Sequence, residues 1–163
     1  MGMQTDVKSF HNTATGVAVP YRTRLKGVVI SPSASSTLNV SICDNNLKTG
    51  TYNIPGTTVC TVTLANHGLT AGSSRVVLNF TSGTAVPDTY LVRTTPTANT
   101  FTVTTGTLTT SGNVNIYTDL LIEIDCATAT SFYTLIPGEG VLATNGVYVF
   151  LPAATVTTTI FYG

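Results

Sequence analysis

Two histidines and three cysteines are the side chains with which this chain of 163 residues could do chemistry. A cysteine nucleophile needs a neighbouring base such as histidine, and a structural zinc site takes four histidine or cysteine ligands. His11 lies in a polar segment near the start of the chain, and His67 stands alone between an asparagine and a glycine. Cys43, Cys60 and Cys126 are an odd number without C-x-x-C spacing, which favours buried free thiols over a redox or metal site.

A pair of carboxylates offers the other candidate chemistry. Glu123 and Asp125 alternate in the segment IEID, so a strand would place both on one face, where they could form an acid/base pair. No cleft and no partner residues are indicated around them. The chain has no G-x-S-x-G elbow and no glycine-rich phosphate loop, and DNNLKTG (44–50) lacks the carboxylates of a calcium loop. We therefore expect no catalytic residues, no cofactor, no metal and no enzymatic activity.

The segment around His67 has the composition of a turn. Asn66-His67-Gly68 follows the alternating run TVTLA and precedes the run SRVVLNF. Asparagine, histidine and glycine tolerate the left-handed backbone angles that tight turns require. We expect Asn66, His67 and Gly68 to form a structural turn whose imidazole bonds the nearby backbone. A catalytic or metal-binding role for His67 is the alternative.

Three basic residues alternate in YRTRLKGV, where Arg22, Arg24 and Lys26 would project from one face of a strand. They could protect an edge strand from aggregation. They could instead pair across strands with Glu123 and Asp125, which also share a face. As a third possibility, they could form a docking stripe for an acidic surface on a partner, and we take them as candidate docking residues.

The composition restricts the class of partner. Charged residues make up 9% of the chain and the net charge is zero, which argues against a nucleic-acid partner. No apolar run approaches the roughly 20 residues of a membrane-spanning helix. Threonine occurs 34 times, so the surface is expected to be neutral and rich in hydroxyl groups. Such a surface loses little solvation energy on packing against another protein, although a general threonine bias would give the same composition.

Alternating and β-branched runs dominate the chain, and helical periodicity is nearly absent. This pattern predicts an all-β fold, a discontinuous antiparallel β-sandwich or jelly-roll-like domain with a small inserted β module. Turns are predicted at 44–46, 66–68, 86–88, 111–113, 137–140 and 145–146. The predicted strands lie near residues 5–9, 24–30, 38–43, 58–64, 75–80, 89–94, 101–105, 120–126, 132–136, 146–151 and 156–162.

The middle of the chain differs from its flanks. Residues 50–112 are especially rich in threonine and are expected to form four short strands joined by tight turns. The flanks, 1–49 and 113–163, carry the longer aliphatic runs and are expected to form the outer sandwich. The module would be inserted at the loop 44–46. The apolar strand 156–162 either lies in the protein's own core or completes a neighbour's sheet.

The segment 63–105 resembles a small β module of virion proteins from tailed bacteriophages, especially marine ones. The resemblance rests on an HGL turn (67–69), Gly72, a TSG loop (81–83), a Tyr-x-Val strand (90–92) and the strand ANTFTVT (98–104), in this order. These elements cover about a quarter of the chain. The resemblance implies a structural protein of the virion and does not imply a position within the particle.

The flanks are similar to a class of small accessory virion proteins of marine phages, through MQTDVKS, RTRLKGVVI, LIPGEGVLATNGVYVFL and the final FYG. The implied role is a head decoration (cement) protein that binds the major capsid protein and stabilises the shell. Such a protein would form a homo-oligomer, be made in the bacterial host cytoplasm and reside on the capsid surface. A tail, neck or fibre component is the first alternative, and a glycan-binding module for host adsorption is the second.

Overall fold

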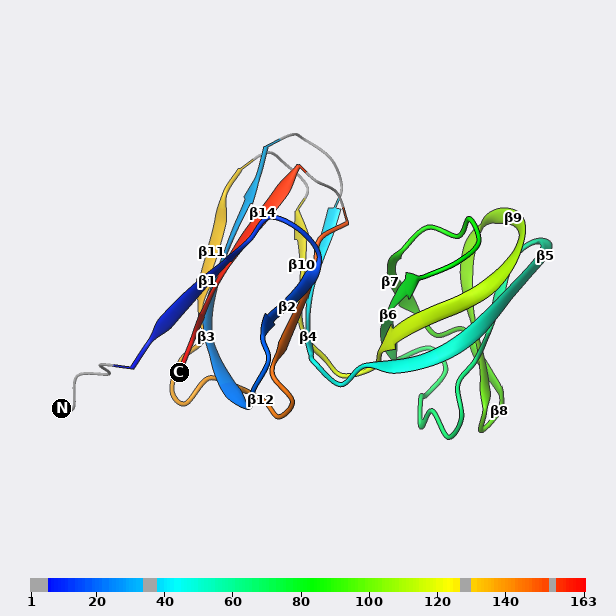
Figure 1. Ribbon diagram of the computed structural model, residues 1–163, viewed down its shortest axis with the longest axis horizontal. Coiled ribbons are helices and arrows are strands. Elements are labelled where there is room, and N and C mark those ends of the chain that lie inside the picture. Colours follow the sequence, from blue (N-terminus) through cyan, green and yellow to red (C-terminus); the bar gives the residue numbers. More distant parts are fainter. Residues whose placement is uncertain (1–5, 34–37, 127–129, 153–154) are drawn as a thin grey trace. The chain divides into compact units, whose positions relative to one another are not determined.

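The computed structural model describes residues 6–33, 38–126, 130–152 and 155–163, and over this part of the chain it contains strands and no helix (Figure 1). The all-β prediction is therefore confirmed. The strands are β1 (Lys8–Asn12), β2 (Gly16–Val19), β3 (Thr23–Pro32), β4 (Leu38–Asp44), β5 (Lys48–Thr63), β6 (Arg75–Phe80), β7 (Asp88–Leu91), β8 (Thr94–Thr97), β9 (Thr100–Tyr117), β10 (Leu120–Cys126), β11 (Phe132–Leu135), β12 (Val141–Ala143), β13 (Val147–Phe150) and β14 (Val156–Tyr162).

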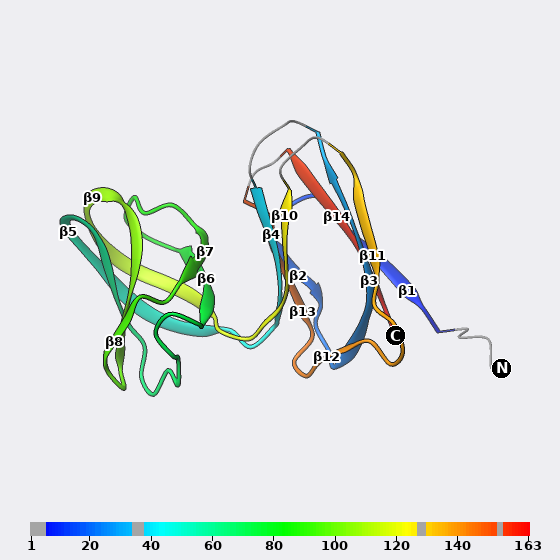
Figure 2. The ribbon, with the colours of Figure 1, turned by 180° about the vertical axis from the view of Figure 1, so that it is seen from behind.

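The chain divides into two compact units, 1–45 with 121–163 (unit 1) and 46–120 (unit 2). Unit 1 is a sandwich of two sheets. One sheet has the order β1-β14-β3-β11, with β12 also paired to β3, and the other has the order β10-β4-β13-β2. Figure 1 and, from behind, Figure 2 show the two sheets as separate layers.

Alternation of side chains builds the core of unit 1. In β14, Val156, Thr158 and Ile160 are buried, whereas the residues between them face outward. Leu25, Val28 and Ile30 of β3 join them, and the opposite sheet contributes Val40, Ile42, Val147 and Val149. Strand β14 lies between β1 and β3 of its own sheet. Of the two possibilities for this strand, the structure therefore shows the first: it lies in the protein's own core.

Unit 2 is built on one long antiparallel pair of strands, β5 and β9, instead of four short strands, and β6, β7 and β8 lie between these two in the chain. Strands β5 and β9 pair from Lys48↔Ile116 to Thr63↔Thr100, with register shifts between Pro55 and Val59 where the pair bends. The two halves of the bent pair enclose an apolar core with β6. The predicted turn at 111–113 is wrong, because these residues lie inside β9 opposite 51–53. The core comprises Tyr52, Ile54, Cys60, Val62, Leu64, Val76, Leu78, Ala85, Val92, Phe101, Val103, Val114 and Ile116.

The two units join where β5 begins and β9 ends. Unit 2 starts at residue 46 and ends at 120, compared with the expected boundaries of 50 and 112. The difference arises because the paired ends of β5 and β9 extend beyond the threonine-rich segment. Asn46 Nδ2 donates to Asp119 Oδ2 at 2.9 Å, and Lys48 Nζ donates to Thr118 Oγ1 at 2.9 Å, so the two connections run side by side.

Candidate functional site: an exposed sheet face

One face of the β1-β14-β3-β11 sheet exposes large apolar side chains. This outer face is the one turned away from the core of unit 1. The register places Phe161 opposite Gly27, and Gly27 opposite Leu135. In the next row, Tyr133 lies opposite Val29. Leu135 is 71% exposed and Tyr133 is 72% exposed. We call Val7, Val29, Tyr133, Leu135 and Phe161 the outer apolar patch.

Gly27 shapes the centre of this patch. A Cβ atom at residue 27 would lie 3.2 Å from Leu135 Cδ2 and 3.6 Å from Phe161 Cδ2, so the two side chains approach each other over the bare backbone of the glycine. Farther along the sheet the face becomes polar: Thr157 Oγ1 donates to the Ser31 carbonyl at 3.5 Å, and Ser131 Oγ donates to Ser31 Oγ at 3.5 Å. The apolar side chains are thus confined to one end of the face.

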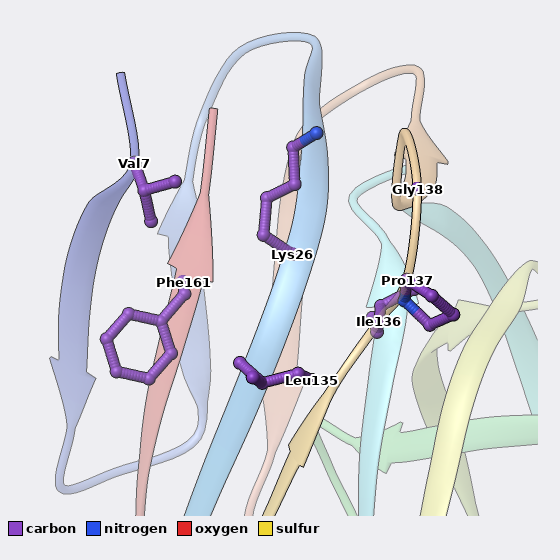
Figure 3. A pocket seen from close by; sticks show the side chains of 7 residues that line it. All are labelled: Val7, Lys26, Leu135, Ile136, Pro137, Gly138 and Phe161. Carbon is purple, nitrogen blue, oxygen red and sulfur yellow. The ribbon is translucent and has the colours of Figure 1, made fainter. Parts of the chain in front are cut away.

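A groove of about 510 Å³ lies at the apolar end, and Figure 3 shows its lining. Apolar side chains make up most of its walls, and among the residues that the structure describes Lys26 is the single charged one that lines it. A contiguous patch of exposed apolar side chains often marks a site where a partner binds, whereas single scattered apolar residues do not. The lining residues are Val7, Lys26, Leu135, Ile136, Pro137, Gly138 and Phe161.

Basic side chains flank the groove. Arg24 and Lys26 alternate with the buried Thr23 and Leu25 in β3, so both project from the outer face. Arg24 Nη1 donates to the Gly140 carbonyl at 3.4 Å, and Lys26 Nζ donates to the Glu139 carbonyl at 2.9 Å. These bonds fix both side chains on main-chain oxygens and leave their positive charges available to an acidic partner.

Arg22 lies outside this row, because it precedes β3. It lines a neighbouring hollow of about 430 Å³ with Lys8, Tyr21 and Tyr162. The ring centroids of Tyr21 and Tyr162 lie 6.5 Å apart in an edge-to-face arrangement, and a hydrogen bond that the Tyr162 hydroxyl donates to Tyr21, together with slight burial, raises the pKa of Tyr162. The structure therefore brings Arg24 and Lys26 together and places Arg22 in the adjacent hollow.

Two of the three interpretations of the basic residues are wrong. Strand β3 is not an edge strand, since it has β14 on one side and β11 and β12 on the other. Pairing across strands with Glu123 and Asp125 is also excluded, because these carboxylates belong to β10 in the other sheet. Docking of a partner is the interpretation that the topology leaves open.

The turn at His67 has the geometry of a structural element. Asn66 and Gly68 have φ angles of 49° and 65°, the left-handed conformation expected of this turn. The amide N–H of Leu69 donates to His67 Nδ1 at 3.0 Å, so Nε2 carries the ring proton and donates to the carbonyls of Thr97 (3.0 Å) and Thr100 (3.2 Å). The imidazole also packs edge to face on Phe101 at 5.5 Å. Both ring nitrogens are therefore used by the backbone.

The three cysteine thiols are buried, which makes them poor nucleophiles. Burial raises the pKa of Cys60 to about 11, and burial together with the nearby Asp125 carboxylate raises the pKa of Cys126. Over residues 6–33, 38–126, 130–152 and 155–163, no three histidine, cysteine, aspartate or glutamate side chains are grouped as metal ligands would be. The same part of the chain contains no helix that could span a membrane.

Sequence reasoning found the basic residues of this surface and missed its apolar patch. Tyr133 and Leu135 stand in the run FYTLI, which has no charged residue to mark an exposed strand. Comparison of the chain with protein-family models, with curated proteins and with solved structures gave no match in any of the three.

Proposed function

We propose that the protein is a non-catalytic structural component of a tailed-phage virion, a head decoration protein that binds the major capsid protein on the outside of the shell. The resemblance of segment 63–105 and of the flanks to phage virion proteins supports the class of protein. The observation that carries the docking role is the outer apolar patch, whose Leu135 and Tyr133 are more than 70% exposed beside Arg24 and Lys26.

Docking would combine burial of the patch with charge pairing at its border. Exposed apolar area contributes roughly 25 cal/mol for each Å² that a partner removes from water. Arg24 and Lys26 would meet carboxylates of the shell protein, which selects the partner and the orientation of binding. An interface of about 1,600 Å², repeated over many equivalent sites, stiffens a shell whose individual contacts are weak.

A charge-reversal experiment tests the docking role. Particles that lack the protein are incubated with purified wild-type protein or with the double variant Arg24→Glu/Lys26→Glu, and bound protein is measured after sedimentation. We expect binding to weaken by about tenfold or more, and Leu135→Glu to weaken it comparably. The matched control, Lys48→Glu/Arg93→Glu, changes the net charge equally on unit 2 and should bind like the wild type. Equal binding of all variants would exclude this surface.

Glycan binding is a second candidate function, favoured by the hollow beside β3. Tyr21 is 50% exposed, and with Tyr162 and Arg22 it offers an aromatic ring and polar groups to a sugar. A glycan array with the intact protein tests this function. Binding that is abolished by Tyr21→Ala would favour host adsorption over shell stabilisation, and an array without signal would count against it.

A further inference from the structure

We propose that strand β11 is a self-association edge, which pairs antiparallel with β11 of a second copy and joins the two outer sheets into one. Among the described residues β11 has a strand neighbour on one side only, namely β3. Three of its four residues, Phe132, Tyr133 and Leu135, are large, apolar and between 47% and 72% exposed. An uncovered edge of this kind is a template for a further strand.

The register identifies the main-chain groups that point away from β3. Ile136 N–H donates to the Lys26 carbonyl at 2.8 Å, and the pairing continues in the same register through Thr134↔Val28 and Phe132↔Ile30. Because hydrogen-bonded and non-hydrogen-bonded pairs alternate in an antiparallel ladder, these residues direct their N–H and C=O groups to β3. The N–H and C=O groups of Tyr133 and Leu135 therefore point to the open edge.

This edge is complementary to itself. A two-fold axis at Thr134 places Tyr133 of one copy opposite Leu135 of the other, and the reverse. Each of these pairs exchanges two N–H···O=C bonds, so that all four outward donors and acceptors on each side find partners. The side chains of Tyr133 and Leu135 from both copies then lie on one continuous outer face, where each covers apolar surface of the other.

Charge favours a second copy as the occupant. The sequence from 131 to 137 contains no charged residue, so the edge lacks the lysine or glutamate side chains that keep natural edge strands apart. Glu123 and Asp125 line a hollow with Phe132, at one end of β11. Lys26 and Arg24 lie toward the other end, where their two positive charges exceed the one negative charge of Glu139. Antiparallel pairing brings the acidic end of each copy to the basic end of its partner.

Sedimentation velocity over a concentration series provides the first test. We expect wild-type protein to form a dimer. The dissociation constant of the Tyr133→Pro dimer should be about thirtyfold higher than that of the Tyr133→Ala dimer, because two outward N–H donors are lost per dimer. The control Tyr133→Ala removes the same ring and keeps the donor, so its dimer should be weaker than that of the wild type and stronger than that of the proline variant. Because Tyr133 N–H makes no bond to β3, both variants should fold, and circular dichroism checks that they do.

A cysteine cross-link tests the register directly. The two-fold axis sets Thr134 opposite Thr134 of the second copy in a non-hydrogen-bonded pair, with Cα atoms about 4.5 Å apart. This distance lies within the range of disulfides, so Thr134→Cys should give a covalent dimer on mild oxidation. The matched control is Ser9→Cys on β1, the other edge of the same sheet, which should stay monomeric on a denaturing gel.

Three results would overturn the proposal. Wild-type protein that stays monomeric at the highest soluble concentration would show that the edge does not self-associate. A Tyr133→Pro variant that dimerises as tightly as the alanine control would show that the edge donors play no part. Cross-linking through Ser9→Cys in place of Thr134→Cys would move the contact to β1.

Discussion

At the scale of single residues, His67 shows how a side chain suited to catalysis is used for structure. Its two ring nitrogens bond one amide and two carbonyls, and these tie the turn at 66–68 to the segment 97–100. A neutral imidazole with a fixed tautomer is required, because Nδ1 must accept and Nε2 must donate. The ring therefore fastens a loop of unit 2 to its core through Phe101.

Substitution of His67 should lower stability. His67→Ala removes these part-buried hydrogen bonds and the ring contact with Phe101, which we expect to lower the free energy of unfolding of unit 2 by about 2–3 kcal/mol. Urea denaturation followed by tyrosine fluorescence measures the change. The control His11→Ala removes one exposed hydrogen bond to Thr159 and should have little effect. Unchanged stability of His67→Ala would contradict the structural role.

Cys60 should make stability depend on alkaline pH. Burial raises its pKa from 9.0 to about 11, so the folded protein keeps the thiol proton to higher pH than the unfolded chain does. The stabilising effect is complete below pH 9.0 and is lost as the pH rises toward 11.

Thermal unfolding across this pH range measures the effect of Cys60. We expect the midpoint to fall with pH in the wild type and to fall less steeply in Cys60→Ala, which cannot ionise at this position. Tyr90, whose pKa burial raises to about 12, adds a decrease of the same sign in both proteins at higher pH. Parallel curves for the two proteins would show that Cys60 is not responsible.

At the scale of elements, the turn between β12 and β13 depends on one carboxylate. Asp44, at the end of β4, accepts hydrogen bonds from Thr144 N–H (3.1 Å), Asn145 N–H (2.8 Å) and Asn145 Nδ2 (3.3 Å). Gly146 follows with a φ angle of 103°, and a Cβ atom there would collide with the Val19 carbonyl. The sandwich thus needs both the aspartate and the glycine to close this corner.

Loss of this carboxylate should destabilise unit 1. Asp44→Ala removes three part-buried hydrogen bonds to a charged acceptor, and we expect it to lower the free energy of unfolding by about 2–3 kcal/mol. The variant Asp44→Asn keeps one acceptor oxygen and should lie between the wild type and alanine. Guanidinium denaturation measures all three proteins, and an alanine variant as stable as the wild type would contradict this account of the corner.

Strand types could be predicted from the sequence where alternation is strong, as in β3, β4 and β14. The length of β5 and β9 could not, because Pro55-Gly56 and Ser111-Gly112 have the composition of turns. In the structure Gly56 lies at a bend in β5, with a φ angle of 77°. Gly112 serves close packing, since a Cβ atom there would lie 2.8 Å from the Ser82 carbonyl oxygen. Both roles depend on neighbours that are distant in sequence.

The candidate site was predictable in part for the same reason. The alternation of Arg24 and Lys26 predicts that they share a face, and β3 places them so. The apolar patch combines Phe161, Gly27 and Leu135 from three strands, and only the sheet order reveals that they form one row. The open edge of β11 likewise follows from topology and not from any local pattern.

At the scale of the whole molecule, the two units should fold separately. Their connections run side by side, with Asn46 bonded to Asp119, so unit 2 can be removed without separating the ends that remain. We expect a chain in which 46–119 is replaced by a short glycine-serine linker to form a stable sandwich. Calorimetry should show one transition for this chain and the same transition in the intact protein. A deletion chain without a cooperative transition would contradict the independence of unit 1.

The proposed decoration role assigns the side chains and the main chain of this region to different tasks. The outward-facing side chains of the outer apolar patch and its basic border would bind the shell protein, while the main-chain groups at the edge of β11 would join neighbouring copies. Pairing of two copies doubles the docking surface and raises the effective concentration of the second surface once the first is bound. Weak individual contacts then suffice for stable attachment.

The copy number in purified virions tests this role most directly. Quantitative mass spectrometry gives the ratio of this protein to the most abundant shell protein. A head decoration protein should occur at a ratio of the same order as the shell protein. A few copies to a few tens of copies per particle would instead indicate a tail, neck or fibre component, and absence of the protein from the particles would contradict a virion function.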